Sequence, residues 1–273
     1  MTHSLSYDVN ASIMFTELPV LERPAAVKAA GFDAVEFWWP FPKSVPQDSE
    51  VDLFVGAVAD AGVELVGLNF AAGDMSLGER GLVSLPTRTQ EFKDSVDVAI
   101  GIAEQLGCRS FNALYGCRVA GVTAQEQDEV ALINLALAGR AAEKVAGTVL
   151  VEMISGPVPY PLRTASDVLA VIDRVRTETR VDNLSLLADL YHMGVNGDDV
   201  LGAVGTDASR IGHVQIADSP GRHEPGSGDL RLEEQLLALE QAGYSGWVGL
   251  EYKPQTSTID GLEWLPQDRR SRR

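Results

Sequence analysis

AGFDAVEF, at residues 30–37, places the end of a helix, a glycine and a short apolar strand within eight positions. Glycine accepts the left-handed backbone that closes a helix, so this segment predicts a turn from helix to strand. The same order recurs in AGVELVGL (61–68), LGCRSFNAL (106–114) and AGYSGWVGLE (242–251). Repeated junctions of this kind indicate a chain built from βα units around a buried parallel sheet.

The rest of the chain alternates between strand-like and helix-like segments in the same way. The predicted strands are residues 7–13, 34–37, 64–69, 110–114, 148–152, 184–189, 211–215 and 247–251, and the predicted helices are residues 19–30, 51–61, 87–106, 124–145, 164–177, 198–204 and 230–241. Such units without an internal linker predict a single α/β domain over residues 1–273, a (β/α)8 TIM barrel. We expect residues 267–273, QDRRSRR, to form a flexible, solvated tail.

The composition limits the classes of function. The 273 residues carry a formal charge of −17, which argues against a nucleic-acid-binding surface with clustered Lys and Arg. Residues 1–10 lack the features of an export signal, no apolar run could cross a bilayer, and Cys108 and Cys117 match no disulfide framework. We therefore expect a cytoplasmic protein whose partner is a small-molecule substrate rather than a nucleic acid or a membrane. A homo-oligomer remains open.

Oxygen-bearing side chains stand where the last four predicted strands end: Glu152, Asp189, Gln215 and Glu251. The active site of a TIM barrel lies at the carboxyl ends of its strands, so we expect these side chains to meet there. A buried carboxylate is costly unless it is paired or binds a cation, and oxygen ligands suit Mg²⁺ or Mn²⁺. One such residue alone is as often a helix cap or a salt-bridge partner. Their occurrence on consecutive strands predicts a shared metal or catalytic site.

Two histidines lie near these strand ends. His192, in ADLYHM, is expected in the loop after Asp189, where it binds substrate oxygens or simply lies on the surface. His213 precedes Gln215 by two residues and should point the same way from one layer deeper. We expect it to be a hydrogen-bonded histidine of the barrel interior.

Loops at the same end of the barrel supply further candidates. SPGRHEPGSGDL (219–230) follows the seventh strand, and its Arg222 could hold a substrate carboxylate or pair with Glu224 on the rim. Lys253 could reach the barrel mouth or be solvated. The loop AAGDMSLGERG (71–81) could act as a lid.

Five stretches carry a resemblance to a known family: VEFWWPF, AGD followed by GERG, ADLYHM, IGHVQIADSPGRHEPGSG and GWVGLEYKPQTST. They resemble the hydroxypyruvate isomerase family, which belongs to the xylose-isomerase-like TIM barrels, and the likeness runs over about residues 5–265. The resemblance implies an isomerase of the aldose–ketose type in which Glu152 and Glu251 donate and accept the proton. It also implies that Glu152, Asp189, Gln215 and Glu251 bind a divalent metal.

Some positions depart from the family pattern. Met153 and Ser155 replace the Pro and Asn of an E-P-I-N pattern, and Leu68 stands where several relatives have histidine. Asp229 replaces a more usual glutamate. These positions line the pocket or its rim, so they bear on the substrate more than on the reaction. We expect a short 2-keto acid, either hydroxypyruvate, giving tartronate semialdehyde, or a 2-oxo-tetronate.

The expected reaction passes through an enediolate whose charge a divalent metal stabilises. Glu152 and Glu251 would move the proton between adjacent carbons. Arg222 would hold the substrate carboxylate, His192 would bind a reacting oxygen, and Lys253 is a further substrate-binding candidate. A metal-dependent ketose 3-epimerase and a non-catalytic sugar-acid-binding barrel remain as alternatives. A nuclease would need a basic groove and more histidines, and a glycosidase needs no Asp–Gln pair beside its carboxylates.

Overall fold

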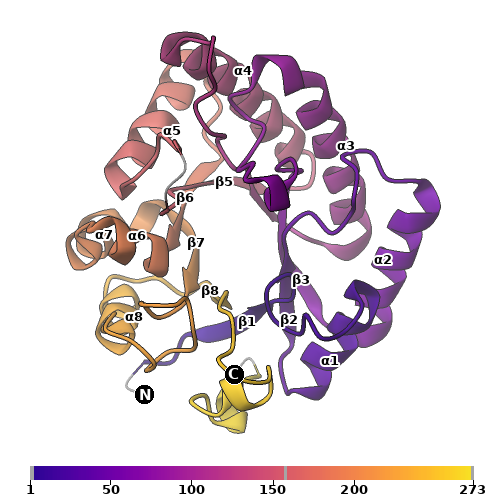
Figure 1. The fold of residues 1–273 in the computed structure, drawn as a ribbon, viewed down its shortest axis with the longest axis vertical. Helices are drawn as coiled ribbons and strands as arrows, with labels where there is room; N and C mark the ends of the chain where they lie inside the picture. The colour runs from indigo at the N-terminus through magenta and orange to yellow at the C-terminus, as the bar shows by residue number, and fades with distance from the viewer. Residues whose placement is uncertain (1–2, 157–158, 272–273) are drawn as a thin grey trace.

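Eight parallel strands close into a barrel in the computed structural model, which describes residues 3–156 and 159–271 (Figure 1). The strands are β1 (Ser6–Asn10), β2 (Ala34–Phe37), β3 (Glu64–Asn69), β4 (Ser110–Asn112), β5 (Thr148–Glu152), β6 (Leu184–Asp189), β7 (Ile211–Ile216) and β8 (Trp247–Leu250). Each strand pairs with the next, and β8 pairs back with β1, where Ser6 lies beside Trp247. The predicted (β/α)8 barrel is confirmed.

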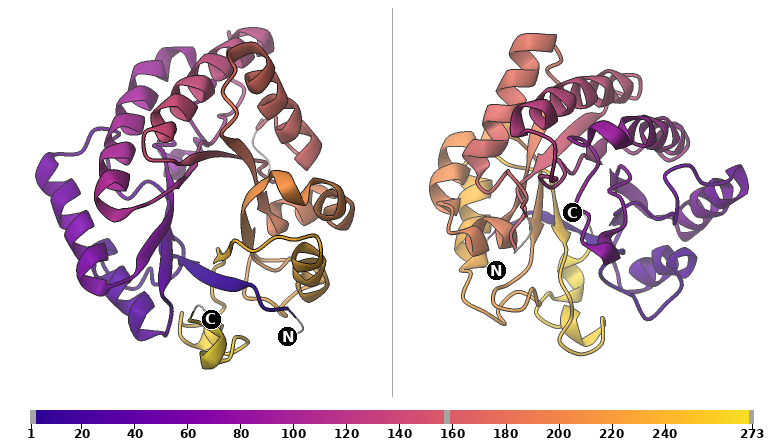
Figure 2. Two further views of the ribbon diagram at one scale, coloured as in Figure 1. Left: turned by 180° about the vertical axis from the view of Figure 1, so that it is seen from behind. Right: turned by 45° about the horizontal axis from the view of Figure 1, so that its top comes forward.

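Helices form the outer ring around these strands (Figure 2). They are α1 (Arg23–Ala29), α2 (Asp48–Ala61), α3 (Thr89–Leu106), α4 (Ala124–Glu143), α5 (Ala165–Thr179), α6 (Leu190–Asn196), α7 (Val200–Asp207) and α8 (Leu232–Gln241). Short 3₁₀ helices are η1 (Val20–Glu22), η2 (Met75–Leu77), η3 (Pro86–Arg88), η4 (Ala208–Arg210), η5 (Asp260–Leu262) and η6 (Gln267–Arg269). Within the described residues, none of the helices has the length and apolar character needed to pass through a membrane.

Glycines end the helices as the repeated junctions predict. Gly62 and Gly107 are the C-caps of α2 and α3, with left-handed φ angles of 66° and 76°. Gly31 and Gly243 follow the C-caps of α1 and α8, with φ angles of 98° and 93°. A side chain with a Cβ atom is strained in this region, so glycine lets the chain turn back towards the next strand.

The strands are buried on both faces, as a parallel sheet covered by helices requires. Phe111 of β4 stacks on Phe70 at 5.5 Å between ring centroids. Phe70 in turn meets Phe92 of α3 edge to face, at 5.6 Å. Contacts of this kind fix the helices against the ring of strands, and the ring holds the strand ends in place.

A helix replaces the loop that the sequence predicts after β6. Helix α6 begins at Leu190, and Asp189 caps it because its Oδ1 accepts a hydrogen bond of 3.0 Å from the backbone N–H of His192. The expectation of a loop at His192 was therefore wrong. The helix is too short to reveal itself through hydrophobic periodicity, although an Asp before it is a common N-cap.

Within the predicted solvated tail, Gln267 and Asp268 are exposed, but Arg269 and Arg270 are partly buried and bind the rest of the chain. Arg270 donates hydrogen bonds of 2.8–3.1 Å to the carbonyl oxygens of Ala30, Leu262 and Leu265. Its guanidinium also lies 5.9 Å from the ring centre of Phe32. The basic residues of this stretch predicted a solvated tail, but an arginine can also donate hydrogen bonds to carbonyl groups at the protein surface. Residues 272–273 of the predicted tail lie outside the described residues.

Candidate active site

The four predicted strand-end residues lie together at the carboxyl end of the barrel. Glu152 ends β5, Asp189 ends β6, Gln215 is the penultimate residue of β7, and Glu251 directly follows β8. All four are buried, with exposures of 5%, 1%, 2% and 4%. Asp189 and Gln215 are partners in the register of β6 and β7. Parallel strands with aligned ends therefore bring these side chains to one place.

A cavity of about 790 Å³ opens at this end of the barrel, and two of the four residues, Glu152 and Glu251, line it. Its lining includes Glu152, His192, Arg222, Glu251 and Lys253, which are the predicted catalytic and substrate-binding residues. A volume of this size accommodates a small molecule.

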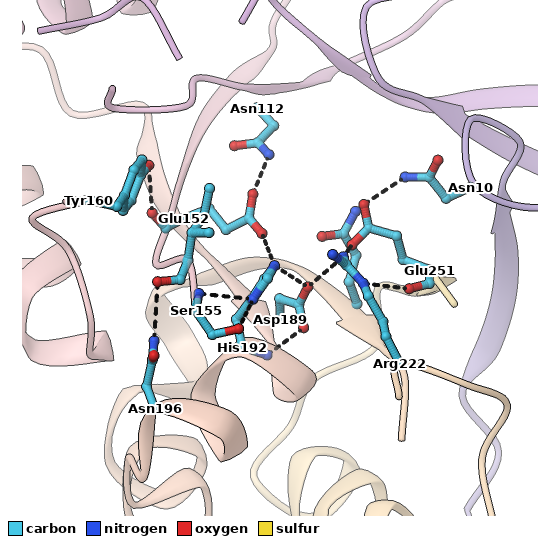
Figure 3. A network of polar contacts seen from close by, with 12 residues as sticks. Asn10, Asn112, Glu152, Ser155, Tyr160, Asp189, His192, Asn196, Arg222 and Glu251 are labelled. Carbon is cyan, nitrogen blue, oxygen red and sulfur yellow. Dashed lines mark hydrogen bonds and ion pairs between the residues drawn. The ribbon is translucent and has the colours of Figure 1, made fainter. Parts of the chain in front are cut away.

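Each glutamate has its own set of hydrogen-bond donors (Figure 3). The Nδ2 of Asn112 donates to Glu152 Oε2 at 2.7 Å. Glu251 Oε1 accepts from Asn10 Nδ2 at 3.1 Å and from the indole N–H of Trp38 at 2.5 Å. The two carboxylates thus sit in unequal surroundings, as an acid and a base in one site require.

Arg222 reaches from the loop after β7 into the centre of the site. Its guanidinium forms an ion pair with Glu251 Oε2 and lies 3.5 Å from Asp189 Oδ2. It also lies 5.2 Å from the ring centre of Tyr191. The alternative partner Glu224 instead accepts a hydrogen bond from the backbone N–H of Gln255. Arg222 therefore belongs to the site and not to the rim.

Burial dominates the electrostatics of the carboxylates. It raises the pKa of Glu152 well above the ordinary value, and the charges of Glu251 and Asp189 raise it further. Burial also raises the pKa of Asp189, although Arg222 acts in the opposite direction. The pKa of Glu251 rises to about 7 through burial, again opposed by Arg222. One guanidinium cannot balance three ionised carboxylates, so the site favours either protonation of a carboxylate or the binding of a further positive charge.

His192 is buried beside these carboxylates and not on a surface loop. Burial, assisted by Arg222, lowers its pKa to about 3, so the imidazole is neutral. Its Nδ1 accepts a hydrogen bond of 3.0 Å from the backbone N–H of Ser155, and the Ser155 hydroxyl lies 2.7 Å from the same atom. The proton of the neutral ring is therefore on Nε2, which lies 3.8 Å from Glu152 Oε1 and 3.6 Å from Asp189 Oδ2. Ser155, a departure from the family pattern, thus orients an N–H donor in the site.

Lys253 is the least engaged of the predicted residues. It is exposed at the edge of the cavity, and its backbone N–H donates to the carbonyl oxygen of Arg222 at 2.7 Å. The backbone of Lys253 therefore supports the loop that carries Arg222.

The 71–81 loop borders the same cavity through Met75, Ser76 and Arg80. Glu79 orders it by accepting from the backbone N–H of Asp74 at 2.5 Å and pairing with Arg88 at 2.8 Å. Its action as a lid stays a prediction.

A layer of buried polar residues lies deeper in the barrel than the strand ends, and of these residues only His213 was predicted from the sequence. Glu36 on β2 accepts from His213 Nε2 at 2.8 Å, which confirms His213 as a hydrogen-bonded residue of the interior. Burial opposes ionisation of both groups, but their contact raises the pKa of His213 to about 9 and lowers the pKa of Glu36. Asp8 of β1 lies beside them with its pKa raised by burial and by Glu36. A charged residue inside the short strand AVEF was the available signal.

The strand-end residues are of types that suit a hard divalent cation, and Glu152 and Asp189 offer oxygen atoms that lie with a His192 nitrogen within 4.8 Å of one another. Carboxylates and an amide oxygen are the ligand types that Mg²⁺ and Mn²⁺ prefer. The Oε1 atom of Gln215 is buried and has no hydrogen-bond partner within the described chain. When ionised, Glu152, Asp189 and Glu251 together exceed the charge of Arg222 by two negative charges, which a divalent cation would neutralise.

Comparison with known proteins places the chain in a family. Residues 24–267 match the family model described as xylose isomerase-like TIM barrel. A putative hydroxypyruvate isomerase of Streptomyces coelicolor is 50% identical, with 98% of each chain covered. A 2-oxo-tetronate isomerase of Cupriavidus necator is 34% identical, with 95% of this chain and 96% of that protein covered. The crystal structure of a family 2 AP endonuclease from Brucella melitensis superimposes with a TM-score of 0.84 at 33% identity, covering 95% of this chain and 98% of that one. The chain therefore belongs to the xylose isomerase-like TIM barrel family.

Proposed function

We propose that this protein is an isomerase of a short 2-keto acid, which interconverts hydroxypyruvate and tartronate semialdehyde or acts on a 2-oxo-tetronate. The observation that carries the proposal is the pair of buried glutamates, Glu152 and Glu251, in one cavity with Arg222. Two carboxylates supply proton transfer, and a guanidinium supplies recognition of an acid. The two relatives described above are named a putative hydroxypyruvate isomerase and a 2-oxo-tetronate isomerase, which supports the reaction class.

The two glutamates suit the two halves of a proton shift. An ionised carboxylate removes the proton from the carbon next to the keto group, and a protonated carboxyl delivers a proton to the former keto carbon. Burial raises the pKa of Glu251 to about 7 and also raises the pKa of Glu152, so both carboxyl groups hold a proton more readily than an exposed glutamate does, as a general acid must. Their roles exchange in the reverse reaction. A proton also passes between the two oxygens, which completes the isomerisation.

Other side chains would bind the substrate. The Nε2–H of His192 faces the carboxylates and can donate to a reacting oxygen. The guanidinium of Arg222 would exchange one of its carboxylate partners for the carboxylate of the substrate. Lys253 at the cavity edge adds a second positive charge along the entry path.

We further propose that Glu152, Asp189, Gln215 and Glu251 hold Mg²⁺ or Mn²⁺. A cation bound there would stabilise the negative charge that develops on the two substrate oxygens. The unpartnered oxygen of Gln215 and the excess of negative charge support this assignment. A location in the cytoplasm agrees with two free cysteines, one of them buried.

Exchange of substrate protons with solvent deuterium tests the proposal. The protein, with and without Mn²⁺ after treatment with a chelator, is incubated in D₂O with a panel of 2-keto acids and neutral ketoses. We expect exchange into a hydroxylated 2-keto acid, dependent on Mn²⁺. Glu152→Gln and Glu251→Gln should each slow it by about 10²–10⁴-fold, the usual contribution of a general acid or base.

Two outcomes would contradict the proposal. Exchange confined to neutral ketoses would favour a ketose 3-epimerase. Tight binding of a sugar acid without exchange, unchanged in both glutamine variants, would indicate a binding protein.

A further inference from the structure

We propose that Glu36 is a positioning residue that fixes the side-chain amide of Gln215 with its oxygen towards the metal site. Glu36 lies on β2, across the barrel from β7. Its role would make a neutral side chain a dependable cation ligand. The inference rests on the metal site assigned under the proposed function.

Glu36 is surrounded by hydrogen-bond donors. Its Oε2 accepts from His213 Nε2 at 2.8 Å. Its Oε1 accepts from Gln215 Nε2 at 2.7 Å and from Asn10 Nδ2 at 3.0 Å. Because Asn10 also donates to Glu251, Glu36 connects to two of the strand-end residues. Glu36 is 4% exposed, so its carboxylate is shielded from bulk water.

These contacts determine which end of the Gln215 amide faces the site. Glu36 presents only acceptor oxygens, so only the NH₂ group of Gln215 can face it favourably. The amide oxygen must then point the other way. That atom, Oε1, is buried and has no hydrogen-bond partner within residues 3–156 and 159–271. An oriented and unsatisfied acceptor is what a cation ligand requires before the ion arrives.

Glycines on neighbouring strands make room for this arrangement. Gly67 of β3 is the register partner of Glu36, and Gly249 of β8 is the register partner of Gln215. A Cβ atom at Gly249 would lie 2.7 Å from Glu36 Oε1 and 3.1 Å from Gln215 Cγ. At Gly67 it would lie 3.1 Å from Glu36 Oε2. Glycine inside a strand commonly marks such a close approach.

The orientation of the Gln215 amide decides whether the negative or the positive end of its dipole faces the metal site. With the observed orientation, Gln215 offers a partial negative charge beside Asp189 and adds no formal charge. With the amide reversed, it would offer N–H groups, which repel a cation. An oriented glutamine therefore completes the ligand set while the balance of three carboxylates, one guanidinium and one divalent ion remains at zero.

An exchange of the two side chains tests the inference. Mn²⁺ binding to chelator-treated protein is measured without substrate, by the electron paramagnetic resonance signal of free Mn²⁺. In Glu36→Gln, the new amide satisfies His213 with its oxygen and turns its NH₂ towards Gln215, whose oxygen is then drawn away from the site. We expect the Kd for Mn²⁺ to rise by about 10- to 100-fold, the usual effect of losing a group that orients a ligand.

The double variant Glu36→Gln/Gln215→Glu separates positioning from general damage. Here the amide at 36 donates to one oxygen of the carboxylate at 215 and leaves the other oxygen for the cation. We expect it to bind Mn²⁺ at least as tightly as Gln215→Glu alone, in which two carboxylates face each other. Independent effects would instead make the double variant weaker than Gln215→Glu by the factor seen for Glu36→Gln. If Glu36→Gln does not fold, this comparison still decides the matter.

The outcomes distinguish this inference from the proposals beneath it. If the wild-type protein binds Mn²⁺ and Glu36→Gln binds it with the same Kd, the positioning role alone would be overturned. A double variant that binds more weakly than Gln215→Glu would do the same. A wild-type protein that binds no Mn²⁺ would overturn the metal site and this inference together, while the deuterium exchange would report on the isomerase separately.

Discussion

Burial of Glu251 predicts that the metal-free protein loses stability as the pH rises. Burial raises the pKa of this carboxyl group from 4.5 to about 7. Below the lower value the group is protonated in the folded and the unfolded chain, and it has no effect. Above about pH 7 it is ionised in both, and the folded chain carries the whole cost of the buried charge. At about 1.4 kcal/mol for each pH unit, the difference lowers the free energy of unfolding by about 3 kcal/mol.

Urea denaturation of chelator-treated protein at about pH 5 and about pH 8 measures this effect. The wild-type free energy of unfolding should fall between the two conditions by about 2.5 kcal/mol more than that of Glu251→Gln, which cannot ionise. This is less than the full difference because Glu251 of the unfolded chain is already mostly ionised at about pH 5. The pKa of about 7 already includes the opposing effect of Arg222, so the ion pair with Arg222 needs no separate correction. The charge of Glu251 also raises the pKa of Glu152, so its removal acts in the same direction. Glu104→Gln, which removes an exposed carboxylate from α3, is the matched control.

Equal losses of stability in the wild type and in Glu251→Gln would refute this reasoning. Saturating Mn²⁺ should abolish the difference between the two conditions, because a bound cation offsets the buried charge. A difference that persists with Mn²⁺ bound would show that the cation does not sit beside Glu251.

Other changes address substrate binding, the imidazole and the chain end. Arg222→Ala should raise KM for a carboxylate substrate by about 10- to 100-fold in steady-state kinetics, the loss of a charged hydrogen bond; an unchanged KM would exclude the clamp. Ser155→Ala should lower kcat about fivefold and leave Tm unchanged, because one contact to His192 is lost; unaltered kcat would contradict its orienting role. Arg270→Ala should lower the free energy of unfolding by about 1–3 kcal/mol in urea without altering activity, whereas wild-type stability would exclude docking of that segment.

Local patterns were sufficient to predict the barrel and the ends of its strands. The strand 34–37 was predicted with its observed bounds, because glycine punctuation and a short apolar run both mark it. The first strand was predicted to continue to Ile13 but ends at Asn10. Alternation of apolar and polar residues persists into the following turn, where Ala11 still donates a backbone hydrogen bond to Glu36 but the strand itself has ended. Strand ends set the site, so Glu152 and Asp189 could be located from sequence.

The partners across the barrel could not be predicted in the same way. Arg222 pairs with Glu251, 29 residues away, whereas the sequence offered a substrate carboxylate or, as the alternative, its near neighbour Glu224. Glu36 sits in a strand of four residues, where periodicity does not reveal which side chains point into the barrel. Its contact with Gln215 spans 179 residues. Such contacts depend on ring closure, which no local window of sequence contains.

The last described helical turn, η6, lies beside the first described residues of the chain. Arg269 donates to the carbonyl oxygen of His3 at 2.8 Å, and β1 lies beside β8. The eight βα units therefore form a ring in space, and the ring does not depend on which unit comes first along the chain. A circular permutant with the ends joined by a short linker and new ends at Gly62, an exposed turn on the face opposite the site, should fold and retain its chemistry.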